Sequence, residues 1–171
     1  MNRLACAALI AAIAGAAAQA QTVVIVRHGE KADQSADPVL SQAGVERAAA
    51  LASSLAGARV SAVLTSSLQR TRLTGQPAAA AAGVLVNPIG MEGGGPAHVA
   101  RVAAAVRRAA PDATVLVVGH SNTVPEIARA LGDADPQVLT DCDYDRMTVI
   151  QLGNGRPKVM HGRYGAPSTS C

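Results

Sequence analysis

Short apolar runs alternate with helical patterns along most of the chain, and this alternation limits the possible fold more than any other feature. Four runs rich in Val, Leu and Ile predict strands, and each is followed by a segment whose apolar residues recur at helical spacing. The predicted strands are residues 22–26, 60–64, 84–89 and 115–118, and the predicted helices are residues 41–55, 66–82, 96–110 and 123–131. Repeated strand–helix units place parallel strands in one sheet with helices on both faces. The sequence therefore predicts a three-layer α/β/α fold with a mainly parallel central sheet.

The last part of the chain departs from this alternation. Residues 147–152 and 158–163 have strand character and flank Gly153-Asn154-Gly155, a pattern typical of a β-hairpin. Two prolines also affect the predicted helices. Pro77 is expected to break or kink one helix, and Pro96 suits the first position of another.

Residues 1–20 have the features of a secretory signal peptide. Arg3 supplies a positive charge, residues 4–18 are apolar, and Ala18-Gln19-Ala20 has the form of a signal peptidase site. We expect cleavage there, a periplasmic or secreted protein without a stable membrane anchor, and a single domain over residues 21–171. The alternative is an uncleaved anchor, for which the stretch is short against the roughly 20 residues that a span needs.

The cysteines bear on the same question. Cleavage would remove Cys6 and leave Cys142 and Cys171. An even pair in an oxidising compartment favours a disulfide, and the alternative is two independent thiols.

Composition argues against a nucleic-acid partner. The chain has no Trp or Phe and two Tyr, so bases would find few rings for stacking, and its net charge of +3 is spread without a basic run. Residues 141–145 (DCDYD) resemble the start of a calcium loop. However, Arg146 takes the place of the required Gly and Leu152 that of the closing Glu, so we predict a polar turn. We expect neither a metal nor a cofactor.

Charged and imidazole side chains follow all four predicted parallel strands. Ligands bind at the carboxyl ends of such strands, so these side chains are expected to meet at one edge of the sheet. They are Arg27 and His28 after the first strand, Arg70 after the second, Glu92 after the third and His120 after the fourth.

The segments that carry these residues resemble the histidine phosphatase superfamily, also called phosphoglycerate mutase-like. The matching segments are Val26-Arg27-His28-Gly29-Glu30, Leu40-Ser41-Gln42-Ala43-Gly44, Ser66-Ser67-Leu68-Gln69-Arg70-Thr71 and Val118-Gly119-His120-Ser121-Asn122. The tail with Tyr144-Asp145-Arg146 is similar to small exported members. The resemblance implies the phosphoglycerate mutase-like fold and catalysis through a phosphohistidine.

The resemblance also implies a role for each residue. His28 would attack phosphorus as a neutral imidazole, and Arg27 and Arg70 would clamp the phosphate. His120, expected to be cationic, would bind the same phosphate and stabilise the charge that spreads over its oxygens.

A carboxylic acid must protonate the leaving oxygen and then activate water. Glu92 is our prediction because it follows the third strand, and Glu30 and Glu126 are the alternatives. Ser121 stands where the acid phosphatase and phytase branch has an Asp, which argues against that branch's donor.

We therefore expect a metal-independent phosphomonoester hydrolase. The chain leaves no room for a large specificity cap, which suits a phosphorylated small molecule, glycan or phosphoprotein as substrate. Two alternatives remain open: a phosphoglycerate mutase-type phosphotransferase, and a non-catalytic module that binds phosphate or a phosphoprotein.

Overall fold

The computed structural model describes residues 20–168. The predicted signal peptide, apart from Ala20, and Cys171 lie outside the described residues. Within residues 20–168, no helix has the length and apolar character needed to cross a membrane.

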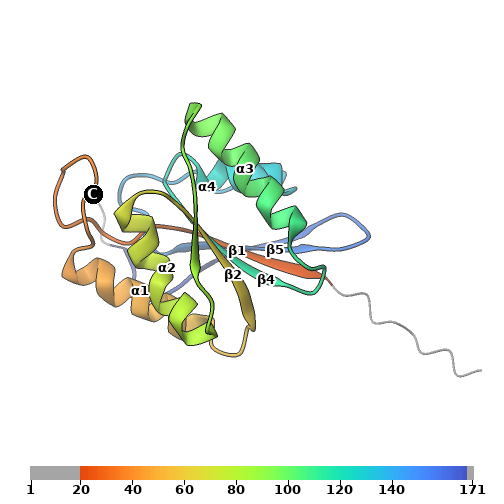
Figure 1. The fold of residues 1–171 in the computed structure, drawn as a ribbon, viewed down its shortest axis with the longest axis horizontal. Coiled ribbons are helices and arrows are strands. Elements are labelled where there is room, and N and C mark those ends of the chain that lie inside the picture. The colour runs from red at the N-terminus through yellow and green to blue at the C-terminus, as the bar shows by residue number, and fades with distance from the viewer. Residues whose placement is uncertain (1–19, 169–171) are drawn as a thin grey trace, which may run out of the picture.

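A six-stranded mixed sheet joins all the strands of the described residues in the order β3-β2-β4-β1-β5-β6 (Figure 1). The strands are β1 (Gln21–Arg27), β2 (Val60–Ser66), β3 (Val86–Ile89), β4 (Thr114–Gly119), β5 (Arg146–Leu152) and β6 (Lys158–Arg163). The first four strands in this order are parallel, whereas β5 runs antiparallel to β1 and β6 antiparallel to β5. The predicted α/β fold, with a mainly parallel sheet and a C-terminal hairpin, is confirmed.

Two pairs of helices cover the two faces of the sheet (Figure 1). The helices are α1 (Gln42–Ser54), α2 (Gln69–Ala82), α3 (Gly94–Arg108) and α4 (Val124–Ala130). On one face, α1 and α2 contribute Leu51 and Ala78 to the core, and on the other α3 and α4 contribute Val106 and Ile127. Because both faces of the central strands are covered, these strands carry apolar residues on both sides.

Three helix starts show how local sequence sets the boundaries. Ser41 caps α1 by accepting a hydrogen bond from the Gly44 N–H, as expected of an N-cap serine. The start predicted for α2 was too early, because Ser66 ends β2 and its Oγ accepts the Leu68 N–H in a turn. The start predicted for α3 was too late: the helix begins at Gly94, and Pro96 still falls in the first turn, where an N–H needs no helical partner. Pro77 does not break α2, which continues to Ala82.

The strand register brings the predicted site residues to one edge. Arg27 at the end of β1 lies opposite Gly119 at the end of β4, and Thr65 of β2 pairs with Val118 of the same strand. The segments that follow these three strands therefore start side by side.

Candidate active site

Backbone hydrogen bonds and the close packing of two glycines fix the turn after β1, which carries His28. The His28 N–H donates to the Gly119 carbonyl at 3.0 Å, and the Gly29 N–H donates to Thr74 Oγ1 at 2.8 Å. A Cβ on Gly29 would lie 2.9 Å from the Gly44 carbonyl oxygen, and one on Gly44 would lie closer still to the Glu30 backbone. Glycine at both positions therefore lets α1 approach the turn closely enough to bury it.

The His28 ring is oriented with one nitrogen free. Its Nδ1 lies 2.7 Å from the Gly29 carbonyl oxygen. A carbonyl oxygen only accepts, so Nδ1 carries the hydrogen and Nε2 keeps its lone pair. Burial lowers the pKa of His28 to about 4, and the nearby Arg27 and Arg70 contribute to the lowering. The imidazole is therefore neutral at neutral pH in the unliganded site.

The second histidine, His120, lies beside the first at the end of β4. The two ring centroids are 5.3 Å apart in an edge-to-face arrangement, and His120 Nε2 lies 2.9 Å from Ser66 Oγ. Ser66 Oγ is in turn 2.8 Å from Thr71 Oγ1, so a chain of hydroxyl groups from the start of α2 holds the ring.

His120 is neutral in the unliganded site, whereas the cation expected from the sequence concerns the site with phosphate bound, so that expectation stays a prediction. Burial is the main cause that lowers the pKa of His120 to about 3, and the neighbouring His28 and Arg70 side chains contribute to the lowering. A bound phosphate would supply the opposite charge and raise this pKa.

The side chains of Arg27 and Arg70 line the same cavity as the two histidines. Arg27 is buried, donates from Nη1 to the Thr140 carbonyl at 2.7 Å, and stacks 4.1 Å from the centroid of the Tyr144 ring. Arg70 Nη1 lies 3.8 Å from Asp37 Oδ1. In both arginines the buried Nε–H has no hydrogen-bond partner among the described residues. Buried donors are almost always paired, so these two groups fit the oxygens of a ligand.

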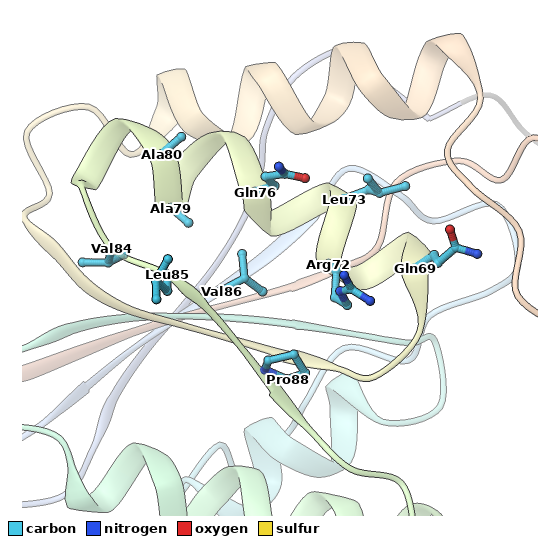
Figure 2. Close-up of a pocket in the computed structure, with 10 residues that line it drawn as sticks. All are labelled: Gln69, Arg72, Leu73, Gln76, Ala79, Ala80, Val84, Leu85, Val86 and Pro88. Atoms are coloured by element: carbon cyan, nitrogen blue, oxygen red, sulfur yellow. The ribbon is translucent and has the colours of Figure 1, made fainter.

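The four residues line one small cavity. Its volume is about 280 Å³, and its other lining residues include Lys31, Met91, Ser121, Asn122 and Asp141. A larger hollow of about 520 Å³ lies between α2 and β3, next to Leu73, Val86 and Pro88 (Figure 2). It contains none of the histidines, so the polar cavity is the candidate site.

None of the three glutamates considered as the general acid is among the residues that line this cavity. Glu92 follows β3 as expected, but its side chain is 85% exposed and its Oε2 lies 3.8 Å from Arg101 Nη2. Glu30 is held by Arg47 through several hydrogen bonds. Glu126 forms an exposed ion pair on its own helix. The acid role of Glu92 stays a prediction, and the structure does not bring its carboxylate to the histidines.

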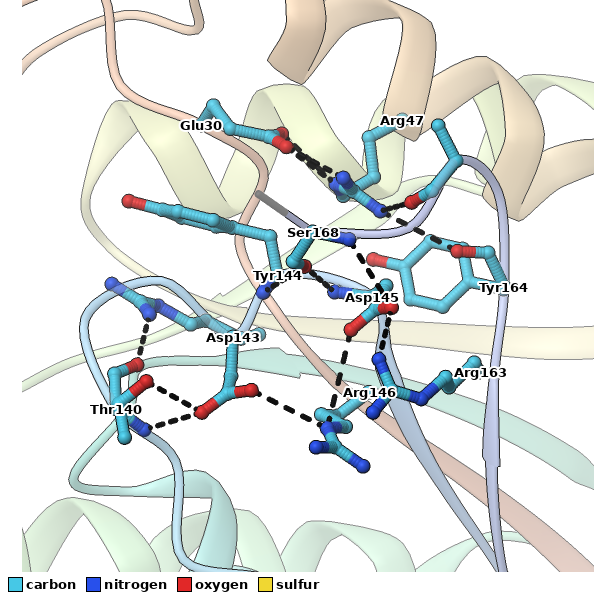
Figure 3. A network of polar contacts seen from close by, with 12 residues as sticks. Glu30, Arg47, Thr140, Asp143, Tyr144, Asp145, Arg146, Arg163, Tyr164 and Ser168 are labelled. Atoms are coloured by element: carbon cyan, nitrogen blue, oxygen red, sulfur yellow. Dashed lines mark hydrogen bonds and ion pairs between the residues drawn. The ribbon is translucent and has the colours of Figure 1, made fainter. Parts of the chain in front are cut away.

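Sequence reasoning missed the loop of residues 140–145 as part of the site (Figure 3). Thr140 and Tyr144 contact Arg27, and Asp141 Oδ1 lies 3.8 Å from Arg27 Nη2. The tail segment Tyr144-Asp145-Arg146 was the one sequence feature that pointed to this loop. No local pattern indicates that Thr140 contacts Arg27, 113 residues earlier in the chain. Cys142 in this loop is disulfide-bonded, and its partner lies outside the described residues, so pairing with Cys171 stays a prediction.

Metal ions in proteins need a cluster of ligand side chains. Residues 20–168 contain no group of three or more His, Cys, Asp or Glu side chains placed to hold an ion. The carboxylate of Asp143 accepts hydrogen bonds from Thr140 N and Oγ1, as in a polar turn.

A buried imidazole, a second imidazole and two arginines thus lie together at the carboxyl edge of an α/β sheet. A sequence model of the Histidine phosphatase superfamily (branch 1) matches residues 23–92, which include three of these four residues. This part of the chain is similar to the histidine phosphatase superfamily.

Solved structures have the same fold. The putative phosphohistidine phosphatase SixA from Nakamurella multipartitia is 26% identical, with a TM-score of 0.61, over 86% of this chain and 98% of that one. SixA in complex with tungstate is 22% identical, with a TM-score of 0.62, over 83% and 96% of the two chains. The mycobacterial glucosyl-3-phosphoglycerate phosphatase Rv2419c is 17% identical, with a TM-score of 0.61, over 82% and 97%. No curated protein sequence matches the chain significantly. Together, the family and these structures support a phosphatase enzyme.

Proposed function

We propose that this protein hydrolyses phosphomonoesters through a phosphohistidine intermediate on His28, without a metal ion. The observation that carries the proposal is the placement of His28. Its neutral ring keeps the Nε2 lone pair toward a cavity where Arg27 and Arg70 each hold a buried Nε–H that has no hydrogen-bond partner among residues 20–168.

The first step follows from these donors. The phosphoryl oxygens accept hydrogen bonds from the two guanidinium groups, which offset the charge and fix the orientation of phosphorus. The Nε2 lone pair of His28 then forms a bond to phosphorus as the bond to the leaving oxygen breaks. The Gly29 carbonyl keeps the Nδ1–H in place and stabilises the positive charge that the ring gains.

The second step reverses the first with water in place of the leaving group. Water attacks phosphorus, the P–N bond breaks, and its electrons return to His28. His120 lies within 5.3 Å of His28 between ring centroids, close enough to donate to the same phosphoryl oxygens. Because the phosphate raises the pKa of His120, the imidazole gains its proton only in the loaded site.

The size and openness of the site support hydrolysis of varied substrates. A cavity of about 280 Å³ accommodates a phosphoryl group and little of what it is attached to. The side chain of Asp141, which lines the cavity, is 95% exposed, so the cavity opens to solvent at this residue. This favours a hydrolase over a mutase-type transferase, which must exclude water. The related structures, named for a phosphohistidine and for a glucosyl-3-phosphoglycerate, support a phosphorylated small molecule, glycan or phosphoprotein as substrate.

The test is an assay of residues 21–171 with nitrophenyl phosphate in the presence of a chelator. We expect turnover to persist, and His28→Ala to abolish both turnover and acid-labile labelling by radioactive substrate. His161→Gln is the matched control, because that histidine lies on β6 and pairs with Asp133, away from the cavity. Loss of activity with chelator and recovery with a divalent ion would contradict the mechanism. Binding of phosphate without turnover would favour a binding module.

A further inference from the structure

The loop of residues 140–145 carries three aspartates, and two of them hold the loop itself together (Figure 3). Asp143 accepts two hydrogen bonds from Thr140, which lower its pKa below the usual range. Asp145 is buried and accepts a hydrogen bond from Arg163 Nη1 at 2.7 Å. Neither residue is among those that line the cavity.

The third aspartate, Asp141, is placed differently. Its side chain is 95% exposed, and its Oδ1 lies 3.8 Å from Arg27 Nη2. It is the one carboxylate among the described residues that line the cavity with His28 and His120. Asp141 therefore lies on the solvent side of the cavity, next to one of the two arginines that would hold the phosphate.

The backbone around Asp141 is fixed on both sides. The preceding residue, Thr140, accepts the hydrogen bond from Arg27 through its carbonyl oxygen. The following residue, Cys142, is disulfide-bonded, and the Tyr144 and Asp145 N–H groups both donate to Ser168 Oγ at 2.9 Å. A fixed backbone keeps the Asp141 side chain within reach of the cavity.

The direction from which His28 attacks phosphorus determines the position that a general acid must occupy. His28 is buried, and in-line displacement puts the leaving oxygen on the side of phosphorus opposite the attacking nitrogen. The leaving group therefore faces the open side, where the remainder of the substrate extends into solvent. Asp141 is on that side, whereas Glu92 and Glu30 have arginine partners outside the cavity.

We propose that Asp141 is the general acid and base of the reaction, an inference that rests on the proposed phosphatase function. In the first step the Asp141 carboxylic acid gives its proton to the leaving oxygen as the P–O bond breaks. In the second step the resulting carboxylate takes a proton from water as the water oxygen bonds to phosphorus and the P–N bond to His28 breaks.

The experiment compares two substrates in Asp141→Asn and in Glu92→Gln, which removes the competing candidate for the general acid. The quantity is kcat/KM, which reports the formation of the phosphohistidine and not its hydrolysis. General acid catalysis typically contributes about 10²–10⁴-fold when the leaving group needs a proton. We expect Asp141→Asn to lower kcat/KM for glycerol phosphate by about 10²-fold or more, and for nitrophenyl phosphate by less than about tenfold.

Two further measurements distinguish a role of Asp141 in proton transfer from a purely structural role. Asp141→Asn should flatten the high-pH limb of the glycerol phosphate profile, and Asp141→Glu should restore part of the loss. Equal losses on both substrates would show that Asp141 acts only through Arg27, and no loss on either would exclude it from the reaction. A selective loss in Glu92→Gln instead would assign the role to Glu92. Wild-type protein that neither turns over nor labels His28 would overturn the phosphatase proposal itself, and the acid role with it.

Discussion

The ion pair between Glu30 and Arg47 should dominate the stability of the segment that follows the nucleophile. Arg47 is buried, and its Nε donates to both Glu30 carboxylate oxygens at 2.9 Å while Nη2 donates to Oε1 at 2.6 Å (Figure 3). Its Nη1 donates to the Ala166 carbonyl at 3.0 Å, which ties the C-terminal segment to α1. Glu30→Gln keeps the shape of the side chain but leaves the Arg47 charge without its counter-ion.

The magnitude follows from burial. Removing one partner of a buried ion pair costs about 3–5 kcal/mol. The Glu30 side chain is 22% exposed and the carbonyl contact to Arg47 remains, so we expect the lower end of this range, about 3 kcal/mol. For a domain of this size each kcal/mol shifts Tm by about 2–4 °C, which gives a decrease of roughly 6–12 °C.

The assay is a double-mutant cycle followed by urea and thermal denaturation. Glu30→Gln, Arg47→Met and the double variant are compared with the wild type. The double variant should lose less stability than the two single losses added together, because no charge is left buried and unpaired. If Glu30→Gln costs less than about 0.5 kcal/mol, the pair behaves as a solvated surface contact and the burial argument is wrong.

Three more outcomes are expected. The pKa values of His28 and His120, about 4 and about 3, lie below the value of 6.5 for an unperturbed histidine. The unfolded chain therefore binds more protons than the folded one. The stability that these two histidines contribute is complete above pH 6.5 and should be lost as the pH falls toward 4. His120→Gln should reduce this loss, as measured by urea denaturation. Arg70→Lys should lower kcat/KM for nitrophenyl phosphate and glycerol phosphate equally, by about 10²-fold or more, because a lysine lacks the planar fork; a difference between the substrates would argue against a phosphate clamp. Exported protein should begin at Gln21 by intact mass, and full-length protein confined to the cytoplasm would contradict the signal peptide.

Sequence alone determined the layers of the fold and four of the residues in the cavity. The apolar runs predicted the strands, because strands buried on both faces must be apolar throughout. The parallel topology then placed Arg27, His28, Arg70 and His120 at one sheet edge, since each directly follows a strand or begins the next helix. These positions are short-range consequences of the backbone, and a local pattern is enough to predict them.

Only the tertiary structure decided which carboxylate reaches the site and how the histidines are charged. Glu92 follows its strand as predicted, yet its side chain turns to Arg101, because side-chain direction depends on neighbours that the strand position does not specify. Asp141 reaches Arg27 across more than a hundred residues, through a loop whose anchors are themselves long-range contacts. His120 is neutral because packing removes water and places cations around it. Desolvation and long-range contacts arise only when the chain packs. The sequence therefore identifies the ionisable side chains, but their protonation states and the contacts they make depend on the tertiary structure.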